Sequence, residues 1–201
     1  MLYLLRHGQT LWNSIGRMQG QKDSPLTARG VAQAQAVGSL LAETLAGETA
    51  ANPRMISSPL GRAWQTAAIV ADRLGIDPLA MALEPRIAEM TFGDWEGHGE
   101  ADLETLFPES WAARRADKWN YVVPGGESYA MVAARLRSWL AELEDDVPLV
   151  VVSHGLAGRI LRGIYLNAEP EAVFAMDEPQ YGFFRLAQGT VTRFDVETVD
   201  T

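Results

Sequence analysis

Continuous apolar runs alternate along the chain with segments in which apolar side chains recur every three or four residues. Leu2 to Leu5 is apolar throughout, a pattern typical of a strand that is covered on both faces. "PLVVVS" at 148–153 contains three consecutive valines, and "RMIS" at 54–57 is shorter; both predict further strands. These runs indicate a buried sheet.

The segments between the strands carry the helical period. Apolar or small residues spaced by three and four predict helices from Thr27 to about Gly47, from Ser58 to Gly75 and from Ser128 to Leu143. In the second of these, Ser58 can cap the helix and Pro59 can take its first position. A fourth helix is predicted to pass through 160–166. This alternation implies an α/β fold with a mainly parallel sheet.

Two segments depart from the alternation. Residues 84–124 are irregular and rich in glycine, proline and tryptophan, which predicts an excursion over the sheet with a helix around 100–118. The tail, "YGFFRLAQGTVTRFDV", predicts a hairpin that turns at Gln188-Gly189 and forms an antiparallel edge of the sheet. Because this edge carries Phe183 and Phe184, we expect that it could pair with a second copy in a homodimer.

Polar residues follow the carboxyl end of each predicted strand. Arg6-His7-Gly8 ends the first, Ser57-Ser58 ends the second with Arg62 one turn later, and Ser153-His154-Gly155 ends the third. In open α/β sheets ligands bind at this edge, where helix N-termini add backbone N–H donors that suit phosphate. Taken singly, each histidine is more often structural and each arginine more often a solvated surface group. Because both histidines and both arginines fall at the same edge of the predicted sheet, they predict a pocket for an anion.

Composition narrows the class of protein. The 201 residues are 47% hydrophobic and 21% charged, enough for one core, so we expect a single domain over 1–201. With no cysteine, disulfides, thiolate nucleophiles and cysteine metal sites are excluded. No window resembles a membrane span, and Arg6 and His7 interrupt the N-terminal apolar run that a signal peptide would need. A cytoplasmic location is therefore favoured.

The charge is negative overall but unevenly distributed. A net charge of −9 argues against non-specific binding to nucleic acid. From Met1 to Arg73, however, seven basic residues outnumber four acidic ones. This segment could attract a small anion locally even though the whole chain would repel a polyanion.

A phosphate ester in the predicted pocket could be both bound and cleaved. Arg6 and Arg62 would hold phosphate oxygens with fork-like donors that stay charged at any working pH. One histidine can attack phosphorus if its second ring nitrogen donates to an acceptor, for which a backbone carbonyl is suited. The other, if charged, would stabilise negative charge on the transferring group. The departing alkoxide needs a proton donor, and the chief candidate is Glu89 in "PRIAEMTFGDWEGH".

Six blocks of sequence follow one another in the order "LLRHGQTLWN", "MQGQKDSPLTARG", "SSPLGRAWQTA", "EMTFGDWEG", "PGGES" and "VVVSHG". In this order they resemble the histidine phosphatase superfamily, also called the phosphoglycerate mutase-like family. The resemblance implies a three-layer α/β/α sandwich with a mainly parallel sheet, an antiparallel edge strand and an inserted cap at about 90–121. Specificity would then lie in the cap, where tryptophans and Phe92 could line an apolar recess or pack the cap on the sheet.

The resemblance also implies a role for each residue of the motifs. His7 would be the nucleophile that forms a phosphohistidine, and Glu89 would protonate the leaving oxygen and then take a proton from water. The remaining pocket residues would be Arg6, Arg62 and His154 around the phosphate, with Asn13, Gln19 and Gly155 in substrate binding. No metal and no other cofactor is implied, because fixed cations supply the positive charge.

The loop that begins at Glu89, which we call the acid loop, differs in sequence between the two activities of this family. Mutases carry Glu-Arg-His-Tyr-Gly where this chain has Glu89-Met90-Thr91-Phe92-Gly93, so their clamp for a substrate carboxylate is missing. "FGDWEG" resembles phosphatases instead, including the α-ribazole phosphatase branch, and Gln9, where many members have glutamate, is expected to tune activity. We therefore predict a metal-independent phosphomonoesterase that acts through phosphohistidine on a small phosphorylated metabolite. The alternatives are a cofactor-dependent phosphoglycerate mutase and a non-catalytic phosphate-binding module.

Three residues near the acid loop have no role in the predicted reaction. Arg114-Arg115 resembles a paired arginine that binds substrate in mutases. Because adjacent residues on a helix point about 100° apart, we favour an exposed cationic patch on a cap helix. His98 is expected to be an exposed loop residue without a function.

Overall fold

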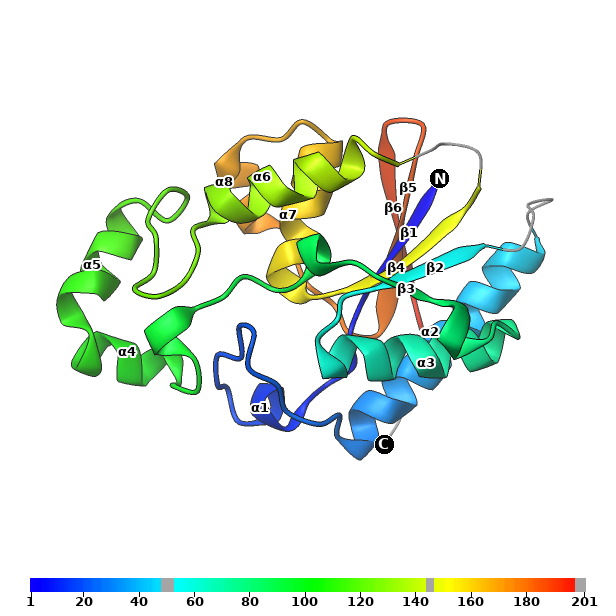
Figure 1. Cartoon of the computed structure of the whole chain (residues 1–201), viewed down its shortest axis with the longest axis horizontal. Helices are drawn as coiled ribbons and strands as arrows, with labels where there is room; N and C mark the ends of the chain where they lie inside the picture. The colour runs from blue at the N-terminus through cyan, green and yellow to red at the C-terminus, as the bar shows by residue number, and fades with distance from the viewer. Residues whose placement is uncertain (48–52, 144–146, 198–201) are drawn as a thin grey trace.

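The computed structural model describes residues 1–47, 53–143 and 147–197, and a β-sheet lies at its centre (Figure 1). In this part of the chain the sheet has six strands in the order β3-β2-β4-β1-β5-β6. They are β1 Leu2–Arg6, β2 Arg54–Ser57, β3 Ala82–Leu83, β4 Leu149–Ser153, β5 Gly182–Ala187 and β6 Thr190–Asp195. β1 to β4 run parallel, whereas β5 pairs antiparallel with both β1 and β6. The predicted mainly parallel sheet with an antiparallel edge is confirmed.

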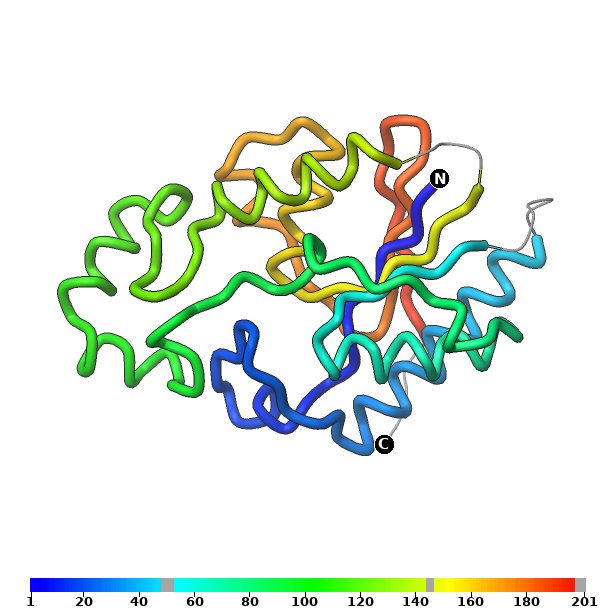
Figure 2. The backbone as a smooth tube through the Cα atoms, in the orientation of Figure 1, coloured from blue at the N-terminus to red at the C-terminus, as the bar shows by residue number. Residues whose placement is uncertain are grey.

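Helices cover both faces of the sheet, as the ribbon and the tube both show (Figures 1 and 2). One face carries α2 (Ala28–Ala46) and α3 (Gly61–Leu74), and the other carries α6 (Tyr129–Leu140), α7 (Gly155–Tyr165) and α8 (Pro170–Ala175). The remaining elements are α1 Leu11–Ser14, α4 Glu100–Leu106, α5 Pro108–Ala116 and three 3-10 turns, η1 Pro78–Ala80, η2 Pro85–Ile87 and η3 Gly93–Trp95. No helix among the described residues is long and apolar enough to cross a membrane.

The first strand is apolar from Leu2 to Leu5 because each of its faces meets a helical layer. Leu2 and Leu4 pack in the cluster that contains side chains of α6 and α7. Tyr3 and Leu5 pack in the cluster that contains side chains of α2 and α3. Successive side chains of a strand point to opposite faces, so a strand between two layers needs apolar residues throughout. Arg6 is the first polar residue, and it stands at the carboxyl edge.

The helix that follows β2 begins later than predicted. α3 starts at Gly61 with Leu60 in the cap position, so Ser58 and Pro59 lie outside it. The Ser58 hydroxyl accepts a hydrogen bond from the Leu60 N–H at 3.3 Å and also lies 2.7 Å from Nε2 of His154. Ser58 therefore serves the strand edge and its histidine instead of capping the helix.

The single helix predicted around 100–118 is two helices. α4 ends at Leu106 and α5 begins at Pro108, and Phe107 between them has φ −134° and ψ 49°. Proline disfavours the helical conformation of the residue before it, which explains the break. The sequence pattern does not predict β3, α1 or α8, which have two, four and six residues and are too short to show a period.

Residues 90–121, which we call the cap segment, carry α4 and α5 away from the two helical layers (Figure 1). Trp95 is fully buried, with its ring centroid 5.5 Å from that of Trp111 and 6.5 Å from that of Phe107. These rings belong to the same core cluster as α6 and α7. Of the two roles considered for the tryptophans, packing of the cap segment therefore applies to Trp95.

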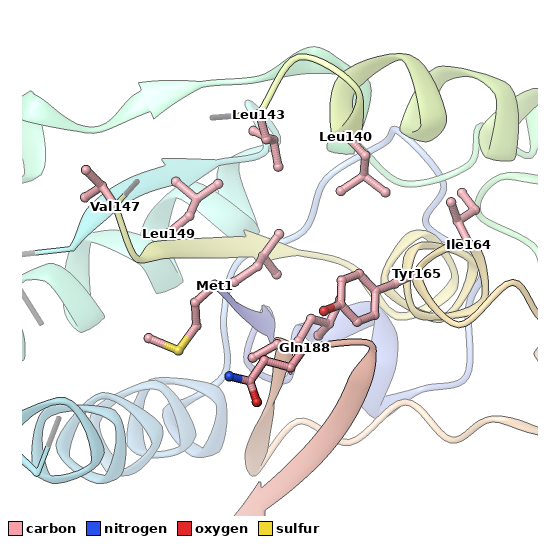
Figure 3. Close-up of a pocket in the computed structure, with 11 residues that line it drawn as sticks. Met1, Leu140, Leu143, Val147, Leu149, Ile164, Tyr165 and Gln188 are labelled. Carbon is pink, nitrogen blue, oxygen red and sulfur yellow. The ribbon is translucent and has the colours of Figure 1, made fainter. Parts of the chain in front are cut away.

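Apolar side chains also gather on the β5–β6 hairpin and at the amino ends of β1 and β4. Phe183 and Phe184 are buried, and Phe183 stacks on Phe194 with ring centroids 4.9 Å apart. These side chains serve the core of this chain, and a homodimer stays a prediction. At the amino ends of β1 and β4, a cavity of about 520 Å³ is lined mainly by aliphatic side chains such as Leu140 and Leu149 (Figure 3).

Candidate active site

The carboxyl ends of β1, β2 and β4 bring the predicted residues together. Arg6 is in register with Ser153, and the N–H of the next residue, His7, donates to the Ser153 carbonyl at 3.1 Å. The rings of His7 and His154 consequently lie 5.2 Å apart between centroids. A pocket of about 390 Å³ is lined by six of the predicted residues: Arg6, His7, Asn13, Gln19, Arg62 and Glu89.

His7 is held in one tautomer. Its Nδ1 lies 2.8 Å from the Gly8 carbonyl oxygen, so Nδ1 carries the proton and donates it. Nε2 is left as the acceptor, and Nε of Arg62 donates to it at 3.3 Å. Burial, followed by the charges of Arg6 and Arg62, lowers the pKa of His7 well below 6.5. The imidazole is therefore neutral, with a lone pair on Nε2 as a nucleophile requires.

Gly8 fixes the carbonyl that orients His7. A Cβ at Gly8 would lie 2.2 Å from the Gly30 carbonyl oxygen, a separation that no larger residue tolerates. The Gly8 N–H donates to the hydroxyl of Thr66 in α3 at 3.1 Å. The glycine of "RHG" is thus required by close packing of the loop after β1 against the start of α2.

Arg62 is only 2% exposed and is held by the loop that follows α1. Its Nη1 donates to the Lys22 carbonyl at 2.8 Å and to Asp23 Oδ1 at 3.0 Å, and its Nη2 donates to the Gly20 carbonyl at 2.6 Å. With Nε on His7, the protein itself occupies four of its five N–H donors. Arg62 orients His7 and contributes positive charge, with fewer free donors for phosphate than predicted.

Arg6 has more unused donors. Its Nη1 donates to the backbone carbonyl of Glu178, and its Nε is buried with no partner among the described residues. Gly155 makes room for this arrangement, because a Cβ there would lie 2.3 Å from the Glu178 carboxylate and 3.1 Å from Cζ of Arg6. Gly155 therefore adjoins the pocket through Arg6 and does not line it.

His154 lies behind His7, in the cap position of α7. Its Nδ1 is buried and has no partner among the described residues. Burial, then the charge of Arg62, lowers the pKa of His154 well below 6.5. His154 is neutral near pH 7, so the charged form considered in the sequence analysis would need a nearby anion to raise its pKa.

Glu89 connects η2 to the first turn of α7. Its carboxylate accepts hydrogen bonds from the N–H groups of Leu156 at 3.2 Å, Ala157 at 2.9 Å and Met90 at 3.1 Å. Burial, followed by the negative charge of Glu178, nevertheless raises the pKa of Glu89 above its usual value. A carboxyl with a raised pKa can donate a proton at mildly acidic pH.

Asn13 and Gln19 line the pocket, and hydrogen bonds to their amide oxygens leave their NH₂ groups as the available donors. Oδ1 of Asn13 accepts from the Thr10 N–H at 3.1 Å and from Nε2 of Gln180 at 3.1 Å. Oε1 of Gln19 accepts from the Ser24 hydroxyl at 3.0 Å. Both amides line the pocket with donors that suit an anion.

The paired arginines of the cap segment divide between the pocket and the surface. Arg114 is buried and lines the pocket, so the prediction of an exposed position is wrong for this residue. Arg115 is exposed, as predicted, and its Nη1 lies 3.6 Å from Oε1 of Glu104. His98 is partly buried, with its ring 5.6 Å from that of Phe107, instead of fully exposed.

Three pocket residues carry no motif that would have identified them. Arg159, one turn after Gly155 in α7, donates from Nη2 to the Tyr129 hydroxyl at 2.8 Å and pairs with Glu178 at 3.2 Å. All three line the pocket. The period of α7 could have placed Arg159 at this edge, whereas Glu178 comes from a loop without a pattern. Among the described residues, no three or more His, Asp or Glu side chains are arranged to hold a metal ion.

Comparison with known proteins identifies the family. The family model described as "Histidine phosphatase superfamily (branch 1)" matches residues 2–190. The chain belongs to this superfamily. Among its relatives, "Probable phosphoglycerate mutase GpmB" of Erwinia tasmaniensis is 38% identical over 176 residues, which cover 84% of this chain and 77% of the relative. The protein of the same name from Proteus mirabilis is 41% identical over 161 residues, covering 78% and 70%.

Two solved structures that share this fold are named as phosphatases. The α-ribazole phosphatase from Shigella flexneri superposes with a TM-score of 0.81 at 26% identity, covering 98% of this chain and 96% of its own. The mycobacterial glucosyl-3-phosphoglycerate phosphatase superposes with a TM-score of 0.74 at 32% identity, covering 92% and 90%. Superfamily and neighbours indicate a histidine-type phosphatase or mutase.

Proposed function

We propose that this chain is a phosphomonoesterase that works without a metal ion, through a phosphohistidine at His7, on a small phosphorylated metabolite. The observation that carries the proposal is the unprotonated Nε2 of His7 in a pocket that also contains a carboxyl with a raised pKa, Glu89. The proposal includes a single domain over 1–201 with a cap insertion at about 90–121. It also retains a cytoplasmic location and the absence of a nucleic-acid partner.

In the first half-reaction, Nε2 of His7 attacks phosphorus and an N–P bond replaces the ester P–O bond. Glu89 gives its proton to the departing alkoxide, which leaves as an alcohol. Arg6 and Arg62 offset the negative charge of the phosphoryl oxygens, and His154 gains a proton more easily beside that charge. Nδ1–H of His7, donating to Gly8, stabilises the positive charge that develops on the ring.

In the second half-reaction, a water attacks the phosphohistidine, and the N–P bond breaks. Glu89, now ionised, takes a proton from that water and returns to its starting state. The N–H groups of Leu156 and Ala157 stabilise the ionised carboxylate during the interval, because they donate to its two oxygens. The products are an alcohol and inorganic phosphate.

Hydrolysis is favoured over phosphoryl shuttling by the acid loop. Met90 and Phe92 stand where mutases carry charged and polar residues, and Met90 is fully buried. Two of the solved structures with this fold are named as phosphatases, each of a different substrate.

A second candidate is a phosphoglycerate mutase that depends on a bisphosphate activator. Two observations favour it: the names of the relatives from Erwinia tasmaniensis and Proteus mirabilis, and the position of Arg114 in the pocket. Incubation with phosphoglycerate, with and without its bisphosphate, separates the two activities. Interconversion of isomers that depends on the activator identifies a mutase, and release of inorganic phosphate without it identifies a phosphatase.

The phosphohistidine itself is testable by rapid quenching at alkaline pH followed by mass spectrometry of the His7 peptide. We expect one added phosphoryl group at His7 during turnover of p-nitrophenyl phosphate, and none in His7→Ala, whose turnover should fall by roughly 10⁴-fold or more. His98→Ala is the matched control, because it removes a histidine that lies outside the pocket lining. Unchanged turnover in His7→Ala, or the absence of any phosphorylated peptide and any hydrolysis, would contradict the proposal.

A further inference from the structure

The segment that joins α8 to β5 borders the candidate active site. β5 pairs antiparallel with β1, with Leu5 opposite Phe183, and the same register, if continued, would place Gln180 opposite Gly8. Gln180 therefore lies beside the residues that follow β1, although 173 positions of sequence separate it from His7. None of the six sequence blocks contains it, and it is not among the residues that line the pocket of His7.

Charged side chains hold the start of this segment in place. The carboxylate of Asp177 pairs with Arg193, and its Oδ1 lies 3.6 Å from Nη1 of Arg162. The backbone carbonyl of Glu178 accepts a hydrogen bond from Nη1 of Arg6. The glutamine two residues further along is therefore presented to the active site by a segment that is fixed on both β5–β6 and α7.

The side-chain amide of Gln180 bridges two residues of the proposed site. Its Nε2 donates to the backbone carbonyl of His7 at 3.2 Å and to Oδ1 of Asn13 at 3.1 Å. Because a backbone carbonyl can only accept, the contact with His7 assigns Nε2 and not Oε1 to this end of the amide. Both N–H donors of Nε2 are then used within the protein.

The orientation of the Asn13 amide follows from its two donors. The backbone N–H of Thr10 can only donate, and it donates to Oδ1 of Asn13 at 3.1 Å. Thr10 and Gln180 thus share one oxygen of Asn13, which leaves Nδ2 as the group available to the pocket that Asn13 lines. Rotation of this amide by half a turn would bring Nδ2 against two donors and place Oδ1 beside a bound anion. Both contacts oppose that rotation.

We propose that Gln180 is a positioning residue, which holds Oδ1 of Asn13 away from the pocket so that Asn13 offers N–H donors to the phosphoryl group. The inference rests on the proposed function, since it takes the bound group to be the phosphoryl group that His7 attacks. Gln180 does not line the pocket, so it acts through Asn13 and not on the substrate. A donor that is oriented in advance binds an anion without the cost of ordering it.

The test is a double-mutant cycle of Gln180→Met and Asn13→Ala, with inorganic phosphate as the probe and calorimetric affinity as the readout. Methionine is about as long as glutamine and has no donor. Gln180→Met alone should weaken phosphate binding about fivefold, within the contribution of one hydrogen bond. In the Asn13→Ala background the same change should have almost no effect, because the amide that Gln180 orients is absent.

Gln180→Glu provides a second cycle at unchanged side-chain size. Its ionised carboxylate would face Oδ1 of Asn13 with an acceptor, which favours the rotated amide. We therefore expect it to weaken phosphate binding more than Gln180→Met does, by about tenfold. The added charge alone contributes to that loss, and the Asn13→Ala background measures this contribution, because it keeps the charge and removes the amide.

Gln65→Met is the matched control, because Gln65 is exposed and lines no part of this pocket. It should bind phosphate like the unmodified chain. The role of Gln180 is ruled out if both of its variants lose as much affinity in the Asn13→Ala background as in the unmodified one, or if neither loses any. Failure of the unmodified chain to bind phosphate would instead contradict the proposed function itself.

Discussion

At the scale of single residues, the proposed mechanism makes the cleavage of a substrate depend on the proton of Glu89. The raised pKa of Glu89, caused first by burial, keeps the carboxyl protonated to higher pH than usual, and the lowered pKa of His7 keeps Nε2 free below pH 6.5. We therefore expect turnover of alkyl phosphates to persist below pH 6.5 and to fall as the pH rises through the raised pKa of Glu89. The kcat of an alkyl phosphate measured against pH checks this.

The variant Glu89→Gln separates proton donation from binding. An alkoxide needs the proton whereas p-nitrophenolate does not, so the variant should lose about 10²- to 10⁴-fold with alkyl phosphates and much less with p-nitrophenyl phosphate. Glu100→Gln removes a carboxylate from the same pocket at an exposed position and should behave like the unmodified chain. Equal losses with both substrates in Glu89→Gln would show that Glu89 is not the proton donor.

At the scale of elements, sequence patterns predict those that are long and fully covered. The apolar runs of β1 and β4 and the periods of α2 and α6 are visible because two helical layers demand apolar side chains at regular positions. The predicted start of α3 is wrong because the Ser58 hydroxyl bonds to His154 instead of capping the helix. No local sequence pattern reveals that contact. The break at Phe107 follows from a local rule, since proline restricts the residue before it.

The β5–β6 hairpin gives a prediction at this scale. Its turn has Gln188 at φ 51° and Gly189 at φ 73°, and a hairpin turn with two positive φ values favours asparagine followed by glycine. Gln188→Asn should therefore raise the free energy of unfolding by roughly 0.5 kcal/mol, within the range of such backbone effects. Gly189→Ala should lower it, although nothing lies within 4 Å of the added Cβ, because the strain comes from φ alone. Urea unfolding of the two variants, with opposite signs expected, is the measurement.

At the scale of the whole molecule, the six motif blocks predict the end of the pocket beside His7 and not the end beside the cap segment. Arg6, His7 and His154 are predictable because parallel strands bring their carboxyl ends to one edge. Arg114 and Glu178 are not, because their positions depend on how the cap segment and a distant loop fold back over that edge. Only the three-dimensional arrangement shows which of two adjacent arginines enters the pocket.

Two buried neutral histidines also tie the stability of the whole chain to pH. His7 and His154 have pKa values well below 6.5, so below pH 6.5 the unfolded chain takes up protons that the folded chain does not. The free energy of unfolding should therefore fall as the pH drops below 6.5, by up to about 1.4 kcal/mol per pH unit for each histidine. Glu89, whose pKa is raised, contributes with the opposite sign, because its stabilising effect is lost as the pH rises.

Comparison of the unmodified chain with His154→Gln isolates the histidine contribution, since Glu89 is common to both. The slope of the free energy of unfolding against pH gives the number of protons that the chain takes up when it unfolds. Urea titrations between about pH 5 and the ordinary histidine pKa of 6.5 should show up to one proton fewer for the variant. Buffers without phosphate are needed, because a bound dianion would raise the pKa of both histidines and reduce the slope of the unmodified chain. An unchanged slope in His154→Gln would mean that His154 is already protonated in the folded chain, and the neutral state assigned to it would be wrong.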